Sequence, residues 1–152
     1  MTAYAIIQRK LTIPKEMEIG VGDVVRKHAE GLLEALLETD FIGRLDYSES
    51  SVLVLDDVID ELWGGEGPSD NAKEFVVKAF GGYIGSVIQK CFHGKWWHDG
   101  NEPVFVLFDG KKQTEVGLLP YSYSVRRFDD SESFAEQWED MEPLVDNRRV
   151  SG

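Results

Sequence analysis

Hydrophobic side chains recur along this chain at spacings that predict a strand, three helices, a strand-rich stretch and a last helix. Residues 2–13 are rich in Tyr, Ile and Leu and are followed by Pro14, which predicts an N-terminal strand over 1–14. Valine and leucine residues between positions 16 and 37 follow helical spacing. Glycines at 20, 22 and 31 weaken that helix, and Asp23 is an alternative start.

Capping patterns mark the starts of the next two helices. Asp46 and Glu49 have capping-box spacing, and Ser48 is an alternative N-cap before an apolar stripe that includes Val52 and Ile59. A glycine-rich loop then precedes a second box-like pair, at residues 71 and 74, and a central helix with a broad apolar face. Gly94, after His93, is a suitable C′ residue for that helix.

Strand-forming residues dominate the chain after Gly94. Residues 104–108 are all apolar, which predicts a central strand that is covered on both faces. The Asp99-Gly100 and Asp109-Gly110 pairs predict turns. Residues 118–126 form the next predicted strand, in which residues 121–125 alternate Tyr and Ser and indicate one solvated face.

A last helix follows, with Asp130 or Ser131 as its cap. Its apolar positions Phe134, Trp138 and Met141 recur at helical spacing, and Pro143 is expected to end it before a flexible tail over 143–152. The order of elements predicts a single α+β domain over 1–152, with helices packed on a small, mainly antiparallel sheet.

Composition supports one packed core in a reducing compartment. The 152 residues are 42% hydrophobic and include 8 Phe, 5 Tyr and 4 Trp, which excludes a disordered chain. The single Cys91 cannot form an internal disulfide, and we find neither a signal peptide nor an apolar run that could span a bilayer. A cytoplasmic protein without membrane contact is therefore expected.

The net charge of −12 is concentrated in two segments. Residues 41–70 carry eight acidic residues and one basic residue, and residues 129–152 carry eight and two. The segment between them holds eight basic and five acidic residues. An overall acidic chain is a poor match for nucleic acid, so a basic protein is the partner that the charge favours.

The acidic residues of the first segment are the candidate partner-binding set. Like charges at i, i+4 destabilise a helix slightly; a solvated face is the simplest explanation for them, and a docking surface for a basic partner is the alternative. Trp97 joins the set because adjacent Trp96 and Trp97 must point to opposite faces of a strand, which leaves one of them partly exposed. The predicted partner-binding residues are Asp56, Asp57, Asp60, Glu61 and Trp97.

A metal site and a catalytic site find little support. Cys91, His93 and His98 are residue types that suit zinc, with Asp99 or Asp109 as a fourth ligand, but their spacing matches no familiar zinc motif. A buried, inert thiol explains Cys91 equally well. No Ser-His or Cys-His arrangement has the spacing that a nucleophile needs, so neither a catalytic residue nor a cofactor is predicted.

Three glycines inside the central helix suggest either close packing or a ligand pocket. Glycine lowers helix propensity by about 1 kcal/mol relative to alanine, so their presence needs a compensating interaction. Close approach of another element to the bare backbone is one explanation. The alternative is a pocket for a ligand or substrate, and its predicted residues are Gly81, Gly82, Gly85, His93, His98 and Tyr121.

Part of the chain resembles an uncharacterised bacterial domain of unknown function. Members of that domain show a Gly-x-Tyr-x-Gly-Glu-Val-Ile helix followed by Gly-x-Trp, and a Leu-Asp-Tyr-Ser helix start, which is found here at 45–48. Ser86 stands where the pattern has Glu. The resemblance covers roughly residues 45–128 and implies no established activity. The matching residues of the first pattern are Gly81, Tyr83, Gly85, Val87, Ile88, Gly94 and Trp96.

Charge distribution and missing catalytic signatures together favour a non-enzymatic binding or regulatory protein. One form of this hypothesis is an immunity-type protein that masks a basic toxin or nuclease through its acidic segments. The alternative is a small enzyme or ligand-binding domain with its pocket over the glycines of the central helix. A concave site joining those residues would favour the alternative, whereas a filled interior would favour interaction with a partner.

Overall fold

A computed structural model describes residues 6–8, 20–64, 66–145 and 149–150. The elements follow the order β1 (Ile6–Gln8), α2 (Val21–Ala35), η1 (Ile42–Arg44), α3 (Ser51–Trp63), α4 (Asp70–Cys91), β2 (Gly94–His98), β3 (Pro103–Asp109), β4 (Lys112–Leu118), α5 (Pro120–Asp129) and α6 (Phe134–Val145). The predicted α+β class is confirmed. The rest of the predicted N-terminal strand lies outside the described residues.

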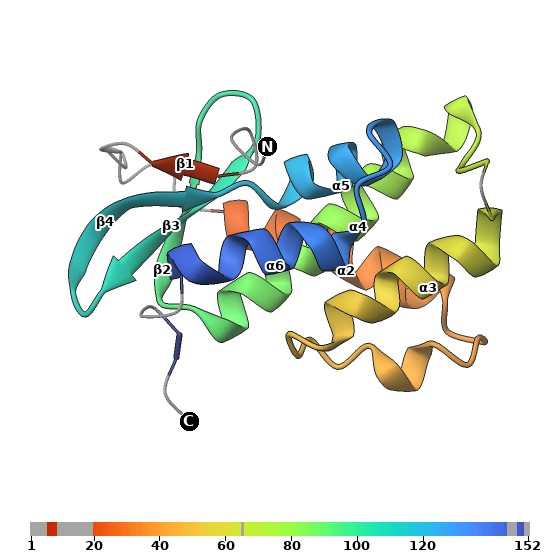
Figure 1. Ribbon diagram of the computed structural model, residues 1–152, viewed down its shortest axis with the longest axis horizontal. Helices are drawn as coiled ribbons and strands as arrows, with labels where there is room; N and C mark the ends of the chain where they lie inside the picture. Colours follow the sequence, from red (N-terminus) through yellow and green to blue (C-terminus); the bar gives the residue numbers. More distant parts are fainter. Residues whose placement is uncertain (1–5, 9–19, 65, 146–148, 151–152) are drawn as a thin grey trace.

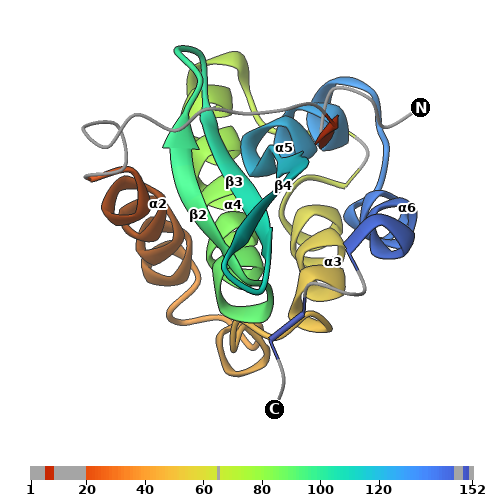
Figure 2. The same cartoon turned by 90° about the vertical axis from the view of Figure 1, so that its left-hand side faces the viewer.

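The helix α4 is the centre of the molecule. Figure 2 shows α4 behind the sheet, with α2 on one side of it and α3 and α6 on the other. Buried residues of α4, among them Phe80, Tyr83 and Ile88, join those of the other helices and of one sheet face in a single hydrophobic core. The predicted central helix therefore packs against most of the domain.

The sheet has the strand order β1-β4-β3-β2, with antiparallel pairing throughout (Figure 1). Strand β3 is an inner strand with both faces buried, as its unbroken apolar sequence predicts. Phe105 and Leu107 face the main core, whereas Val104 and Val106 join Leu119 on the opposite face. Gly100 and Gly110 have positive φ in the two turns that flank β3.

Residues 121–125 form part of helix α5, so the strand predicted at 118–126 is wrong. Pro120 occupies the first turn of α5, where its fixed φ favours a helix and its missing N–H leaves no donor unpaired. The alternation misleads because Ser122 and Ser124 are buried, whereas Val125 is 40% exposed. Strand β4 instead covers residues 112–118 and ends just before α5 begins.

Several predicted helix ends also differ from the structure. Ser69 caps α4 by accepting a hydrogen bond from the N–H of Ala72, whereas the sequence predicted a capping box at residues 71 and 74. Gly94 begins β2 and is not a C′ residue. Pro143 lies inside α6, which runs on to Val145.

Residues 149 and 150, which follow α6, contact the rest of the fold. Arg149 forms an antiparallel bridge with Phe92, and the N–H of Val150 donates to the carbonyl of Cys91 at 2.8 Å. Described residues of the predicted flexible tail therefore contact the end of α4.

Candidate functional site

The two acidic segments of the sequence meet in space. Helix α3 comes from the first segment and helix α6 from the second, and the two pack against each other. Together they carry eight carboxylates and no lysine or arginine. We call the outward side of these two helices the acidic face; its exposed carboxylates include Asp57, Asp60, Glu61, Glu136, Glu139 and Asp140.

Asp56 holds the junction between these helices together. Its Oδ1 accepts from the N–H of Phe134 at 3.0 Å, and its Oδ2 accepts from the N–H of Ala135 at 3.0 Å, so Asp56 caps the N-terminus of α6. The Nε of Arg127 also donates to Oδ1 at 2.9 Å. The side chain is only 17% exposed. Asp56 therefore serves the fold, and its predicted role in partner binding is not supported.

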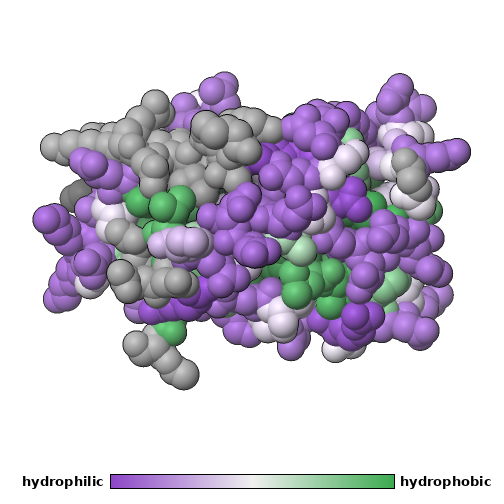
Figure 3. Space-filling view, in the orientation of Figure 1, coloured by the Kyte–Doolittle hydropathy of each residue, from purple (hydrophilic) through white to green (hydrophobic). Residues whose placement is uncertain are grey.

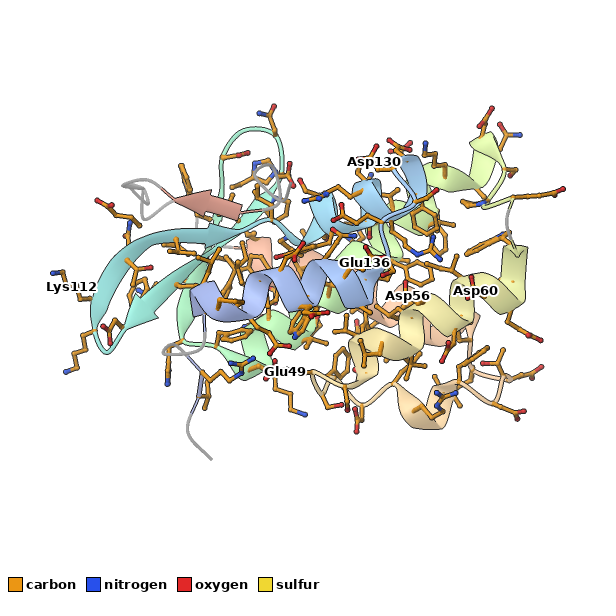
Figure 4. The ribbon with its side chains drawn as sticks, viewed as in Figure 1. Glu49, Asp56, Asp60, Lys112, Asp130 and Glu136 are labelled. Atoms are coloured by element: carbon orange, nitrogen blue, oxygen red, sulfur yellow. The ribbon has the colours of Figure 1, made fainter. Side chains whose placement is uncertain are left out.

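The other predicted carboxylates of α3 point outward. Asp57 is 60% exposed and lies 3.4 Å from the guanidinium of Arg44. Asp60 is 71% exposed and lies 3.6 Å from that of Arg127. Figure 4 shows Asp60 and Glu136 on either side of the junction between α3 and α6. These exposed pairs are worth little to stability, and both carboxylates stay accessible to a partner.

Glu49 forms a second polar contact beneath the acidic face. Its two carboxylate oxygens accept from the Nε and Nη2 of Arg149 at 2.9 and 2.8 Å, and from the indole of Trp138 at 3.1 Å. The hydrogen bonds from Arg149, together with that from Trp138, lower the pKa of Glu49 despite partial burial. The spacing of Asp46 and Glu49 predicted a capping box, and nothing local in the sequence indicates the distant partners of Glu49.

Trp97 does not belong to the acidic face. It lies on β2 and packs, partly buried, against the small cluster of Val104, Val106 and Leu119 on the outer side of the sheet. Trp96 is the buried member of the pair, at 6% exposure. The sheet and α3 lie at opposite ends of the molecule (Figure 1), so Trp97 and the α3 carboxylates cannot form one contact surface.

The backbone at the three central glycines is covered by neighbouring helices. A Cβ at Gly81 would lie 2.9 Å from the Cα of Tyr121, and one at Gly82 would lie 2.8 Å from the backbone of Ala29. A Cβ at Gly85 would lie 2.8 Å from Val25. Close packing therefore explains these glycines. The space over them is filled by α2, α5 and Trp96, so they form no floor for the alternative pocket.

The other residues of the alternative pocket are dispersed. His93 is exposed between α4 and β2, and His98 accepts a hydrogen bond from the N–H of Gly100 at the far end of β2. Tyr121 bonds instead to Nδ1 of His28. Burial, together with the charge of Lys78, lowers the pKa of His28, and burial raises that of Tyr121.

The described residues contain no group of three or more His, Cys, Asp or Glu side chains arranged to hold a metal ion. Cys91 is a free, partly buried thiol, and burial raises its pKa, which disfavours the thiolate that a metal would bind. No helix in the described ranges combines the length and hydrophobicity needed to cross a bilayer.

A groove that the sequence did not reveal lies between α2 and β2. It has a volume of about 910 Å³ and is lined by aromatic residues that include Tyr47, Trp96 and Phe105, and by the charged side chains of Arg26 and Lys90. Its residues come from α2, α4, β2, β3 and the segment before α3, so only the folded chain brings them together.

Tyr47 helps to shape this groove. It has a positive φ of 64°, an unusual conformation for a residue with a side chain. Its N–H donates to the hydroxyl of Tyr83 at 3.0 Å, and the two rings stack with centroids 4.9 Å apart. Ser51 holds the same hydroxyl at 2.7 Å.

Comparisons with protein families, curated proteins and solved structures found no match to this chain.

Proposed function

We propose that this protein is a non-enzymatic binding protein that docks a basic protein partner on the acidic face. The observation that carries the proposal is the meeting of α3 and α6, which turns two acidic segments far apart in sequence into one surface. Glu61, Glu139 and Asp140 have no lysine or arginine within ion-pair distance among the described residues. Their charges are therefore available to a partner.

Exposed leucines add apolar contact area to the acidic face. Leu53 is 49% exposed and Leu62 is 46% exposed. Leu53 precedes Asp57 by four residues, so the two lie on the same side of α3. Figure 3 shows a hydrophobic area over α3 within largely hydrophilic surface. Binding surfaces commonly combine an apolar centre with a polar, charged rim, and this combination supports docking of a protein.

An immunity-type protein that masks a basic toxin or nuclease is the specific form that we favour. Such a partner would carry lysine and arginine residues opposite the acidic face, and steering by opposite charges would speed its association. A cytoplasmic location is part of the proposal, because one unpaired cysteine is compatible with a reducing compartment.

Binding to a panel of purified small basic proteins, cationic nucleases included, tests the proposal. A variant with Asp60→Asn, Glu136→Gln and Glu139→Gln removes three charges from the acidic face. Its matched control, Glu34→Gln with Glu38→Gln and Glu115→Gln, removes three exposed charges from other surfaces. We expect the first variant to weaken binding about tenfold, since each exposed charge pair contributes roughly 0.5 kcal/mol, and the control to change it little.

Salt dependence supplies the second readout. Binding of the unaltered chain should weaken steeply between about 50 and 200 mM salt, because exposed charges are screened over this range. Equal weakening by both triple variants would mean that net charge alone drives binding. That result, salt-indifferent binding, or failure to bind any of the basic proteins would contradict the proposal.

A further inference from the structure

The groove between α2 and β2 runs beside an unpaired strand edge. Among the described residues, strand β2 is the last strand of the sheet and pairs only with β3. The N–H of Phe108 donates to the carbonyl of His93 at 2.8 Å, which fixes the alternation of the ladder. The amide groups of Gly94, Trp96 and His98 therefore point away from β3. No other described residue offers them a backbone partner.

Aromatic side chains form the floor of the groove below this edge. The Trp96 indole packs edge-on against Phe105, with ring centroids 5.0 Å apart, and donates to Gln89 at 3.0 Å. A Cβ at Gly22 would lie 3.1 Å from the Trp96 ring, so a side chain there would crowd the indole. The floor is thus apolar, and the Trp96 N–H is already satisfied.

Charges along the groove differ from those of the acidic face. Arg26, Lys90 and Lys95 contribute three positive charges, and Asp23 and Glu30 contribute two negative charges. Asp23 also lies 3.4 Å from the Arg26 guanidinium. In a chain whose net charge is −12, the described residues that line this groove include more cations than anions.

We infer that this groove binds an extended, acidic peptide segment of a partner protein, which adds to the sheet along the free edge of β2. Backbone hydrogen bonds to the edge would hold the segment, as in other cases of strand addition. Its alternate side chains would point into the groove beside Trp96, and an acidic residue would lie near Arg26 and Lys90.

Helix α2 decides what kind of partner fits. It runs beside β2 (Figure 2), so the edge is approached through a groove and not across an open surface. A second copy of this chain would bring its own α2 alongside its own β2, and the two helices would obstruct strand pairing. A single extended segment is narrow enough, because paired strands lie only about 4.8 Å apart.

This site is separate from the acidic face, which lies on the other side of α4. A library of random linear peptides displayed on phage, panned against the full chain, is the probe. We expect acidic peptides to be enriched. Amide hydrogen exchange with a selected synthetic peptide should then show slower exchange at Gly94 and Trp96 than in the free protein.

Two charge reversals supply a matched comparison. Arg26→Glu alters the groove, whereas Lys27→Glu alters the adjacent position, which lines a different hollow beside Phe75. Both changes place a glutamate near Asp23 and Glu30 on the same helix, and Arg26→Glu also removes the exposed ion pair with Asp23. We expect Arg26→Glu to weaken the selected peptide about fivefold and Lys27→Glu to weaken it less than about twofold.

Four outcomes would overturn the inference. The first is failure to enrich any peptide, and the second is peptide binding that leaves exchange at Gly94 and Trp96 unchanged. The third is slow exchange of these amides in the free protein, because another part of the chain would then hold the edge. The fourth is enrichment of basic peptides whose binding the acidic-face variant abolishes, a result that supports the proposed function alone.

Discussion

Two contacts within the helical part of the molecule are built on opposite principles. Helix α4 meets α2 and α5 along a glycine seam, formed by Gly81, Gly82 and Gly85, where bare backbone touches its neighbours. Helix α3 meets α6 at a polar joint, where the carboxylates of Glu49 and Asp56 bind distant N–H groups. The seam requires residues without a Cβ atom, and the joint requires charged carboxylates.

This difference determines how each contact responds to change. Added volume at the seam has no room, because protein interiors are packed as densely as organic crystals. Salt should affect it little, because the contact is made by uncharged backbone. The joint tolerates volume changes better, but it weakens when a carboxylate is removed or protonated. Each contact can therefore be disturbed by a change that should spare the other.

The largest effect is expected for Gly82→Ala in the glycine seam. The new Cβ would lie 2.4 Å from the Cβ of His28 and 2.8 Å from the carbonyl oxygen of Val25, so α2 would have to move. We expect the free energy of unfolding, measured by urea denaturation, to fall by about 3 kcal/mol. A loss below about 1 kcal/mol would mean that the seam can open without strain.

Gly31→Ala on α2 is the control for this substitution. Its Cβ would meet only the ring of Phe75, at 3.9 Å, an ordinary contact distance. We expect this variant to gain about 0.5 to 1 kcal/mol from the better helix propensity of alanine. Opposite signs of the change in unfolding free energy for the two substitutions would show that a residue without a side chain is required at the seam. They would also exclude a general effect of replacing glycine.

The polar joint should respond to Asp56→Ala by losing about 2 kcal/mol, since the first two N–H groups of α6 lose their acceptor and Arg127 loses its closest carboxylate. Asp56→Asn should lose less, because its amide oxygen can still accept one N–H. Thermal or urea unfolding measures both. Asp57→Ala, one residue along and exposed, should change stability by less than about 0.5 kcal/mol. Equal losses at the two positions would contradict the assigned capping role.

The sequence predicted the glycine seam better than it predicted the polar joint. A stripe of hydrophobic residues identified α4, and three glycines within it already required a close neighbour for the backbone. The identity of that neighbour was hidden, because Tyr121 lies in a Tyr-Ser alternation that suggests a strand. Ser122 and Ser124 are buried on α5, which the alternation did not reveal.

The partners of Glu49 and Asp56 could not be inferred from local spacing. Each carboxylate lies among other acidic residues that are solvated, and its partners are 71 to 100 residues away in the chain. The acidic face and the α2–β2 groove are products of the same long-range packing. Charge counts could indicate two acidic segments, but not that they become one surface.

Acid should weaken the joint at Glu49. Hydrogen bonds from Arg149 lower the pKa of Glu49 below its ordinary value of 4.5. As the pH falls below 4.5, the Glu49 carboxylate becomes protonated in the unfolded chain before it does in the folded chain. The stability that Glu49 contributes is therefore present above pH 4.5 and is lost as the pH falls through the folded-state pKa. In the Glu49→Gln variant the free energy of unfolding should fall less at low pH. The difference should be less than about 1 kcal/mol, because the carboxylate is partly exposed.

Glu102 gives the opposite sign and serves as the contrast. Burial raises its pKa above 4.5, so the folded chain keeps this proton to higher pH than the unfolded chain does. Its contribution to stability therefore falls as the pH rises from 4.5 through the raised value. Unfolding curves recorded between about pH 3 and pH 7 should separate the two variants. Parallel curves for Glu49→Gln and Glu102→Gln would contradict both assignments.

The smallest effect concerns a residue that belongs to neither contact. Glu61 follows Asp57 by four residues, so two negative charges lie together on the outer side of α3. Glu61→Gln should relieve this repulsion and raise the free energy of unfolding by about 0.2 to 0.5 kcal/mol, measured at low salt, with the gain disappearing at high salt. Destabilisation would mean that Glu61 serves the fold as Asp56 does. A small gain would show that α3 bears this charge at a cost to its own stability, as a surface kept for a basic partner would.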